Sequence, residues 1–537
     1  MANTKVRIGW VPWCSDVNHR RYFGSASEQQ SWMASHLTTF SADDFTYQRE
    51  NMTMDVPLNF EQLTGCNYVA YQNADYGSKW YYAFIKSMQY KAKETTTLSL
   101  ETDYLETWLF DFAWEAAFVE REIVTSDGIG EHTMNEGLDV GNYIQTNRDQ
   151  NPPEGISLSN MYSVVITTAY PKLISGQGGW EYTIQTAVGG DRYNGVYSGA
   201  SLIAFSNTAD FQWFTEQMTK NGGADAIVGA FMVPKGMIDK GYGTSPCDNG
   251  HGAWVNSGEV AYAAEKKYTV NCSDIDGYVP KNNKLFTYPY NVVCLSDTNN
   301  ELELMPERFQ SVNGSSGNKE VSFGWYMVCE QNSGMMASPN KYNGVSPNYE
   351  YAIVTSGWPQ VNWNVDAFSQ YMTSSFIGSL ANTAGTIAMM IPQMRVAGMA
   401  GQISKAISAG TVASAATQMT GGLTEAALKP NQLKGGSTSN LKQGMRIGLP
   451  YVYQKQCKTD IAKAIDDHFT VYGYCIEQVK VPARTGRPCW NYVQTRHADF
   501  NGKVPEYAMD AINRMHDEGI WYWHVDDVGN FGLDNSL

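Results

Sequence analysis

Two pairs of acidic residues lie close to tryptophans, an arrangement that could serve carbohydrate chemistry. Glu101 and Asp103 precede Trp108, and Asp526 and Asp527 follow a tryptophan-rich stretch. Glycoside hydrolysis uses two carboxyl groups that flank the sugar bond, and neighbouring aromatic rings could form a platform for the sugar. Carboxylates are also common helix caps and turn residues. We expect this second, structural role for both pairs.

Other patterns for catalysis or ligand binding are sparse. The chain contains no GxxxxGK[ST], HExxH or GxSxG motif. His516 and His524 are near neighbours at an expected helix end, but two histidines alone are a weak indication of a metal site. Asp274 and Asp276 belong to an SDIDG fragment that lacks the later ligands of a calcium loop, so an ordinary turn is expected. We therefore predict no catalytic, cofactor-binding or metal-binding residues.

The nine cysteines and the N-terminal sequence bear on the compartment in which the chain is made. The cysteine number is odd, no two cysteines are close in sequence, and no CxxC occurs. This pattern favours buried reduced thiols made in a cytoplasm over a disulfide framework or a zinc site. The N-terminus has no long apolar core, so no signal peptide is expected. If the protein acts outside the producing cell, lysis or assembly must carry it there.

Composition and charge exclude one large functional class. The chain has 537 residues, of which 13% are aromatic and 17% charged, and its net charge is −16. This length allows two to four domains. The low charged fraction suggests extensive contact surface, as in an assembly. A nucleic-acid reader needs a basic surface to neutralise phosphates, so the acidic balance argues against one. An acidic wall would instead suit a conduit through which DNA slides without sticking.

One stretch, from Phe376 to Leu428, differs from the rest of the chain in composition. Its only charges before Glu425 are Arg395 and Lys405, and nearly all other residues are Ala, Gly, Ser, Thr, Ile or Met. The two basic residues leave two uncharged segments of about nineteen residues, close to the length of a membrane-spanning helix. Abundant Gly, Ala, Ser and Thr make neither segment apolar enough for a resident membrane helix. We interpret the stretch as soluble or membrane-bound depending on state; a Gly/Ala-rich disordered linker is the alternative.

The side chains predicted to contact lipid or headgroups are the larger apolar residues of this stretch and its two cations. They are Phe376, Ile377, Leu380, Ile387, Met389, Met390, Ile391, Met394, Arg395, Met399, Ile403, Lys405, Ile407, Val412 and Met419. Single insertion energies of such residues are small, so several copies of the chain would have to act together.

Alternation of apolar and polar residues predicts a mainly β fold with some helix. Strands are expected near 5–13, 51–58, 67–72, 79–90, 95–100, 117–123, 284–294, 320–329, 444–456 and 468–482. Helices are expected at 28–37, 206–221 and 505–518, with a helical or corner segment at 103–112.

Six phrases of the sequence carry a family resemblance. They are QNADYGSKWYYAF (72–84), ETDYLETWLFDF (101–112), NEGLDVG (135–141), KLFTYPY (284–290), NYVQTRHADFNG (491–502) and DEGIWYWHVDDVGNF (517–531). With the Gly/Ala/Met-rich stretch between the fourth and fifth, they resemble the distal tail protein, or tail-knob protein, of small short-tailed bacteriophages of the Picovirinae type. The resemblance covers the first 145 residues and about the last 250, and no phrase between 150 and 283 contributes to it.

The resemblance implies a homohexameric tube of β-barrel tail-tube domains. Its hydrophobic loops plug the tube before DNA ejection and then form a channel through the host cytoplasmic membrane. The implied partners are five further copies, the proximal tail tube or lower collar protein, membrane lipids, and viral DNA in the lumen. The implied location is the tail tip of the virion and, during ejection, the host membrane. Six copies would carry 6 × −16 = −96 charges along the DNA path.

The expected domain organisation follows from turn-rich boundaries and this resemblance. Residues 1–149, 284–373 and 441–537 are three parts of the tube domain, 150–283 is an inserted knob domain, and 374–440 is the plug and membrane-penetrating loop. Two other classes stay open at this point. One is a tail protein that degrades or binds cell-wall glycans, and the other is a pore-forming toxin made by a host.

Overall fold

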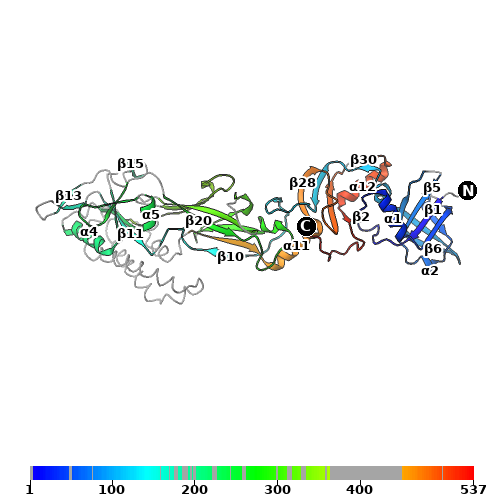
Figure 1. The fold of residues 1–537 in the computed structure, drawn as a ribbon, viewed down its shortest axis with the longest axis horizontal. Helices are drawn as coiled ribbons and strands as arrows, with labels where there is room; N and C mark the ends of the chain where they lie inside the picture. Colours follow the sequence, from blue (N-terminus) through cyan, green and yellow to red (C-terminus); the bar gives the residue numbers. More distant parts are fainter. Residues whose placement is uncertain are drawn as a thin grey trace, which may run out of the picture. The chain divides into compact units, whose positions relative to one another are not determined.

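The computed structural model describes residues 4–362 apart from short gaps, which are densest between 168 and 261, and residues 450–536 apart from 499. The chain divides into two compact units. Unit 1 comprises Met1–Asn142, Asp274–Tyr290 and Cys457–Leu537, and unit 2 comprises Tyr143–Ser273 and Asn291–Gln456. The backbone therefore passes from one unit to the other four times. Both units are mainly β with some helix, as predicted (Figure 1).

A six-stranded antiparallel sheet forms the N-terminal part of unit 1. Its strand order is β3-β1-β5-β6-β7-β4. The strands are β1 (Thr4–Gly9), β3 (Phe40–Phe45), β4 (Thr53–Val56), β5 (Tyr68–Asn73), β6 (Tyr81–Ala92) and β7 (Thr95–Thr102). In Figure 1, β1, β5 and β6 lie side by side in this sheet.

A second sheet of unit 1 joins the two ends of the chain. Its order is β2-β31-β29-β9-β28, with β2 and β31 parallel and the other pairs antiparallel. The strands are β2 (His19–Arg21), β9 (Ala117–Glu122), β28 (Tyr474–Lys480), β29 (Trp490–Arg496) and β31 (Ile520–Trp523). The short pair β8 (Phe112–Ala113) and β30 (Asn501–Gly502) completes the strands of this unit.

The helices of unit 1 begin and end at residues that suit those positions. They are α1 (Ala26–His36), α2 (Phe60–Leu63), α3 (Tyr104–Trp108), α11 (Thr459–Tyr472), α12 (Glu506–Glu518) and the 3-10 turn η3 (Asn283–Phe286). The Ser25 side chain caps α1 by accepting from Glu28 N. Gly473 ends α11 at φ +69°, where a Cβ would lie 2.0 Å from the Glu122 carbonyl oxygen. Only glycine fits there.

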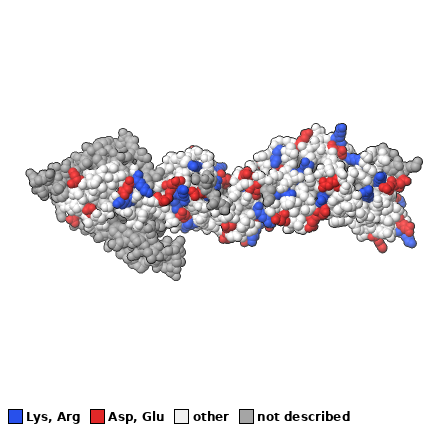
Figure 2. All heavy atoms as spheres, viewed as in Figure 1, with Lys and Arg blue, Asp and Glu red and all other residues white. Residues whose placement is uncertain are grey.

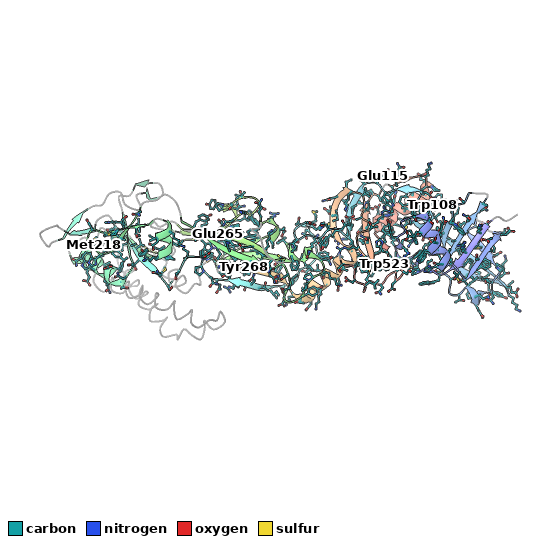
Figure 3. The ribbon with its side chains drawn as sticks, in the orientation of Figure 1. Trp108, Glu115, Met218, Glu265, Tyr268 and Trp523 are labelled. Carbon is teal, nitrogen blue, oxygen red and sulfur yellow. The ribbon has the colours of Figure 1, made fainter. Side chains whose placement is uncertain are left out.

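Alternate residues of β5 divide between two hydrophobic cores, as the period of two in a strand requires. Tyr68 and Ala70 pack with Leu105 and the helices α3 and α12. Val69 and Tyr71 belong to a separate core with β1, β4 and β7. Both faces of the sheet are therefore buried at β5. Figure 3 shows the side chains of both units, with Trp108 and Trp523 among the buried aromatic residues of unit 1.

Unit 2 contains three larger sheets. The four-stranded sheet β10-β27-β21-β22 and the four-stranded sheet β20-β23-β24-β25 are accompanied by a six-stranded one, β18-β19-β16-β11-β17-β26. Their strands are β10 (Tyr143–Asp149), β11 (Met161–Thr167), β16 (Ser201–Phe205), β17 (Ile227–Pro234), β18 (Thr244–Pro246), β19 (Ala253–Val255), β20 (Tyr262–Val270), β21 (Asn291–Ser296), β22 (Glu301–Leu304), β23 (Lys319–Met327), β24 (Gly334–Pro339), β25 (Ile353–Ser356), β26 (Gln360–Asn362) and β27 (Tyr451–Cys457).

Shorter elements complete the described part of unit 2. The two-stranded sheets pair β12 (Tyr170–Leu173) with β13 (Trp180–Thr183), and β14 (Arg192–Tyr193) with β15 (Val196–Tyr197). The helical elements are α4 (Thr208–Lys220), α5 (Lys235–Gly241), η4 (Pro306–Arg308) and η5 (Tyr349–Tyr351). Strands β20 and β10 lie near each other in Figure 1. The hydroxyl of Tyr268 on β20 donates to the carbonyl oxygen of Asn147 on β10 (2.7 Å).

Two secondary-structure expectations were wrong. Residues 468–472 belong to α11, not to a strand, and the strand starts only at Tyr474. The β-branched and aromatic residues after His468 obscured the helical spacing of Ala462, Ile465 and Phe469, which are all buried. The expected strand 284–294 begins instead with η3, and its extended part is Asn291–Ser296. Of 444–456, only 450–456 is described, and β27 starts at Tyr451.

The boundaries of the predicted insert, residues 150–283, can be compared with those of the two observed units. Residues 150–273 fall in unit 2, which also includes 291–456, whereas 274–283 fall in unit 1. The assembly of barrels into a ring concerns several copies and stays a prediction.

Candidate functional site

The fifteen residues predicted to contact the membrane, from Phe376 to Met419, lie outside the described residues. Among the residues that the structure does describe, no helix is both long and apolar enough to span a bilayer. The strands at the two ends of the segment 363–449 are described, and both belong to unit 2. They define the attachment points of the predicted loop.

The two attachment strands differ in their place within a sheet. Among the described residues, β26 is an edge strand that pairs only with β17, with Val361 opposite Ala230. β27 lies between β10 and β21, and its Val452 is completely buried. A strand with neighbours on both sides is harder to displace than an edge strand. The C-terminal attachment of the segment is therefore the more firmly held.

One buried amide fastens β27 to three other segments of unit 2. The Gln454 side chain, fully buried, donates to Asn291 Oδ1 (2.9 Å) and to the Asn271 carbonyl oxygen (3.1 Å). Its Oε1 accepts from Asn271 N (2.8 Å) and from Asn147 Nδ2 (3.0 Å). All four hydrogen-bonding positions of this amide are thus used. A fully satisfied buried polar group specifies the strand register, because any shift would leave it unpaired.

A cluster beside Lys455 of β27 has the residue types of a metal site, but the lysine ammonium already pairs with its carboxylates. The ligand atoms of Cys294, Glu301 and Glu303 lie within 4.8 Å of one another. The Lys455 ammonium pairs with Glu301 and, at 2.8 Å, with Glu303, and the Tyr453 hydroxyl also donates to Glu301. Burial raises the pKa of the Cys294 thiol to about 12, which keeps it protonated. Lysine therefore supplies the positive charge at this position.

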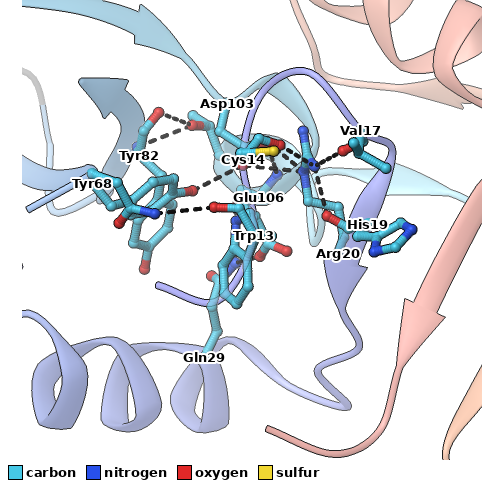
Figure 4. Close-up of polar contacts among 12 residues, drawn as sticks. Trp13, Cys14, Val17, His19, Arg20, Gln29, Tyr68, Tyr82, Asp103 and Glu106 are labelled. Carbon is cyan, nitrogen blue, oxygen red and sulfur yellow. Dashed lines mark hydrogen bonds and ion pairs between the residues drawn. The ribbon is translucent and has the colours of Figure 1, made fainter. Parts of the chain in front are cut away.

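The acidic residues near Trp108 have structural roles, as expected, and the buried neighbour of Asp103 is Glu106 and not Glu101. Asp103 caps α3 by accepting from Glu106 N (3.3 Å), and its carboxylate also contacts Arg20 Nε (3.2 Å) and the Tyr68 hydroxyl (2.9 Å) (Figure 4). Glu106 lies beside it, 1% exposed, whereas Glu101 is on the surface, 3.1 Å from the Lys86 ammonium. Glu101 and Asp103 are two residues apart but have different surroundings, because Glu101 belongs to the strand β7 and Asp103 is the N-cap of the helix α3.

Burial raises the pKa of the Glu106 carboxyl to about 8, and the charge of Asp103 acts in the same direction. Gln29 Nε2 donates to Glu106 Oε2 (2.7 Å), while Oε1 has no hydrogen-bond partner among the described residues. A neutral acid beside an ionised carboxylate is the combination that a glycosidase uses. Here, however, both groups are only 1% exposed. A sugar cannot reach them, so the pair is a buried structural cluster.

The second acidic pair also has structural roles. Asp526 lies 2.8 Å from Arg21 Nη1 and accepts from Trp32 Nε1 (2.9 Å). Asp527 accepts from Asn530 Nδ2 (2.7 Å) within a turn. The two carboxylates therefore hold different segments and do not act as a pair, as the structural interpretation predicted.

The histidines and the SDIDG fragment likewise have separate partners. His516 is buried between the Ile512 carbonyl oxygen and the Tyr522 hydroxyl, both at 2.7 Å, and burial lowers its pKa to about 4. His524 Nε2 lies 3.1 Å from Asn491 Oδ1. Asp274 accepts from Gly277 N (3.0 Å), which is the expected turn.

A set of three carboxylates, missed in the sequence, holds residues 274–290, which we call the connector. Asp466 of α11 accepts from Lys281 N (2.8 Å), Asn282 N (3.0 Å) and the Tyr278 hydroxyl (2.6 Å). Asp127 accepts from Asn283 N (2.8 Å). The only sequence signal was Asp466 itself, an acid on the apolar face of a helix, which must find partners when buried.

The third carboxylate of the connector, Glu136, is shared by two cations. It pairs with the Lys284 ammonium and the Arg121 guanidinium, and Cys475 N donates to it (2.9 Å). The side chains of Glu136 and Lys284 are 0% and 1% exposed. Glu136 belongs to the NEGLDVG phrase, so that phrase fastens the connector to β28.

The charged and sulfur-containing residues agree with the expectations where the structure describes them. Eight cysteines are described and all are free, six of them buried, with Cys14 exposed and Cys475 half-buried. Figure 2 shows acidic and basic side chains interspersed on the visible face, without a single basic patch. The acidic conduit concerns an assembly of copies and stays a prediction.

Comparisons with known proteins agree along the whole chain. Residues 258–536 match the family model described as Bacillus phage phi29, Tail knob protein gp9, C-terminal domain, and residues 2–113 match the Caudoviral major tail protein N-terminus. The Tail knob protein gp9 of Bacillus phage PZA and that of Bacillus phage phi29 are each 25% identical to this chain, over 100% of it and 99% of their own length. The solved structure of the bacteriophage C1 tail knob protein, gp12, superimposes with a TM-score of 0.62 at 12% identity, covering 97% of both chains.

Proposed function

From the premise that this chain belongs to the family of the phage phi29 tail knob protein gp9, we propose that several copies of it form the distal tube of a short phage tail. The family match spans 279 of 537 residues and carries the assignment. At the coarse level the chain is a structural tail knob protein of a short-tailed phage. The finer proposals are a homohexameric ring, a plug formed by residues 374–440, and conversion of that plug into a channel across the host cytoplasmic membrane.

An exposed sheet edge in unit 1 supports assembly with further copies. Within the part of the chain that the structure describes, β28 is the last strand of its sheet, and Val479 and Val481 on this segment are 71% and 49% exposed. Val479 lies opposite Phe118, which in turn lies opposite Arg496. An unpaired edge with apolar side chains tends to be covered by another chain. We propose a second copy as the neighbour at this edge.

The attachment of the segment 363–449 supports the plug proposal. Its 87 residues start after β26, an edge strand, and end at β27, a strand held by the Gln454 network. A long segment between two fixed strands can change its conformation while the unit that carries it stays folded. The proposed partners are membrane lipids during ejection, the lower collar protein at the other end of the tube, and DNA in the lumen without specific binding.

The test separates assembly from membrane activity. Sedimentation of the full-length protein should show a hexamer, and it should release dye from liposomes. The double variant Ile387→Asp/Ile407→Asp should lose dye release, because a charge within each uncharged segment opposes insertion. The matched variant Ile387→Val/Ile407→Val should keep it, and both should stay hexameric with unchanged thermal stability. Dye release by the Asp variant would contradict the membrane proposal. A monomer at micromolar concentration would contradict the proposed hexamer.

No observation favours the glycan-degrading alternative. The paired carboxyls that it requires are buried at Asp103 and Glu106, and the other candidate pair holds Arg21 and a turn. The relatives from Bacillus phages PZA and phi29 are named tail knob proteins, which agrees with a structural role.

A further inference from the structure

A pocket in unit 1 is lined, among the residues that the structure describes, by the two cationic residues Lys281 and Arg487 and by no acidic residue. Its polar lining comes from Lys281, Asn282, Thr470, Arg487, Asn535 and Ser536. The pocket is small and opens to solvent on one side. The lining combines the connector, α11 and the C-terminal end of the chain, so a ligand in this pocket would join three segments that are distant in sequence.

Arg487 brings a buried positive charge to this pocket without an ion pair. The residue is 8% exposed. Its Nε donates to the Val124 carbonyl oxygen (3.2 Å) and its Nη1 to the Asn535 carbonyl oxygen (3.3 Å). Within the described residues, Nη2 has no hydrogen bond and no carboxylate lies within ion-pair distance of the guanidinium. Burial lowers the pKa of Arg487, but a guanidinium stays charged in proteins.

Lys281 brings a second cation to the pocket, and it too lacks a partner. Its backbone N–H donates to Asp466, but its exposed ammonium makes no hydrogen bond or ion pair with any described residue. Lysine ammonium groups have three donors that an anion can use.

The carboxylates near the pocket are already bonded to other groups. Asp127, which attracts Arg487, accepts from the Tyr474 hydroxyl (2.8 Å) and Asn283 N (2.8 Å). Asp534, which attracts Lys281, accepts from Ser536 N (3.1 Å) and the Ser536 hydroxyl (2.7 Å). Asp466 accepts from the connector, as described above. These acids reduce the positive potential, but none of them lines the pocket.

We propose that this pocket is a binding site for a small inorganic oxyanion of the sulfate or phosphate class, held by Arg487 and Lys281. A buried charge without an ion-pair partner at contact distance is costly, and a bound anion would supply that partner. The planar guanidinium donates N–H groups in the geometry that oxyanions accept. The bound anion would fasten the C-terminal end and the connector to α11 and so stabilise unit 1.

The first test measures thermal unfolding of the full-length protein in sodium sulfate, with sodium chloride keeping the ionic strength constant. Sulfate should raise the unfolding temperature in a saturable manner, as expected when a ligand binds only the folded state. Lys281→Gln should weaken the apparent sulfate affinity about tenfold. Lys503→Gln removes the same charge from an exposed lysine outside the pocket and should leave the affinity unchanged.

Sulfate also stabilises proteins in general by exclusion from their surface. That effect does not saturate and would be the same in both variants. An unsaturable rise, or equal sulfate responses of Lys281→Gln and Lys503→Gln, would overturn the proposal.

The second test uses selenate, the selenium analogue of sulfate, and needs no variant at Arg487, whose replacement could unfold the protein. Anomalous diffraction from a crystal of the wild-type protein soaked in selenate should place selenium beside Arg487 Nη2. Well-ordered selenium elsewhere with none in this pocket would contradict the assignment.

Discussion

Unit 1 holds two buried charge clusters with opposite proportions of acid and base. At α3, the carboxyls of Asp103 and Glu106 lie beside the guanidinium of Arg20. At the connector, the carboxylate of Glu136 lies between two cations. Protonation can neutralise the surplus carboxyl group in the first cluster. The surplus arginine or lysine in the second cluster does not lose its charge as readily. The first cluster should therefore respond mainly to pH, and the second mainly to mutation.

The largest expected effect is that of removing the shared acid of the connector cluster. Glu136→Gln keeps the shape of the side chain but leaves the buried Lys284 and the half-buried Arg121 without their shared carboxylate. Breaking a buried ion pair in this way costs about 3–5 kcal/mol. We expect the free energy of unfolding of unit 1, measured by urea denaturation of the full-length chain at pH 7, to fall by that amount.

Glu115→Gln is the matched control for this change, because Glu115 is exposed and on the same unit. It should alter stability by less than about 0.5 kcal/mol. Equal, small effects of the two substitutions would show that the connector does not depend on this carboxylate.

The next effect is the pH response of the α3 cluster. The pKa of Glu106 rises from 4.5 to about 8 on folding, so the folded chain holds a proton that the unfolded chain releases. The stability due to this group is fully present below pH 4.5 and is lost as pH rises to about 8. Glu106→Gln stays neutral, so at pH 9 it should be more stable than the wild type by about 2–4 kcal/mol.

Urea denaturation at pH 5, 7 and 9 measures this difference, which should shrink towards pH 5. Glu101→Gln, on the exposed end of β7, should show the pH profile of the wild type. A constant difference between Glu106→Gln and the wild type at all three pH values would mean that Glu106 does not titrate in this range.

The smallest effect concerns Lys455, a cation that two acids share near water. Hydrogen bonds to Glu301 and Glu303 raise the pKa of Lys455, although desolvation, the largest single influence, acts against them. The side chains of Lys455, Glu301 and Glu303 are 21%, 37% and 44% exposed, so solvent screens the cluster. Lys455→Met should cost about 1 kcal/mol or less, and 0.5 M NaCl should reduce that cost further. A loss of stability as large as that caused by Glu136→Gln would show that solvent exposure does not explain the difference between the two clusters.

Some elements of the fold followed from short-range patterns. The alternation at 79–90 predicted β6, and the apolar spacing between Pro505 and Gly519 predicted α12, because each pattern repeats within a few residues. The helix at 459–472 was missed where β-branched and aromatic residues overlap a helical face. The structural role expected for Asp103 is confirmed, because it caps α3, but only the tertiary structure shows that Glu106 is buried beside it.

The sequence by itself determined the class of this protein and the position of the Gly/Ala/Met-rich segment, because composition and long phrases are properties of the linear chain. Only the tertiary structure decided which charges meet. Glu136 and Lys284 are 148 residues apart, and Lys281 and Arg487 lie farther apart still. No local pattern encodes such pairs, because the free energy of a buried charge depends on partners that the chain brings together only by folding.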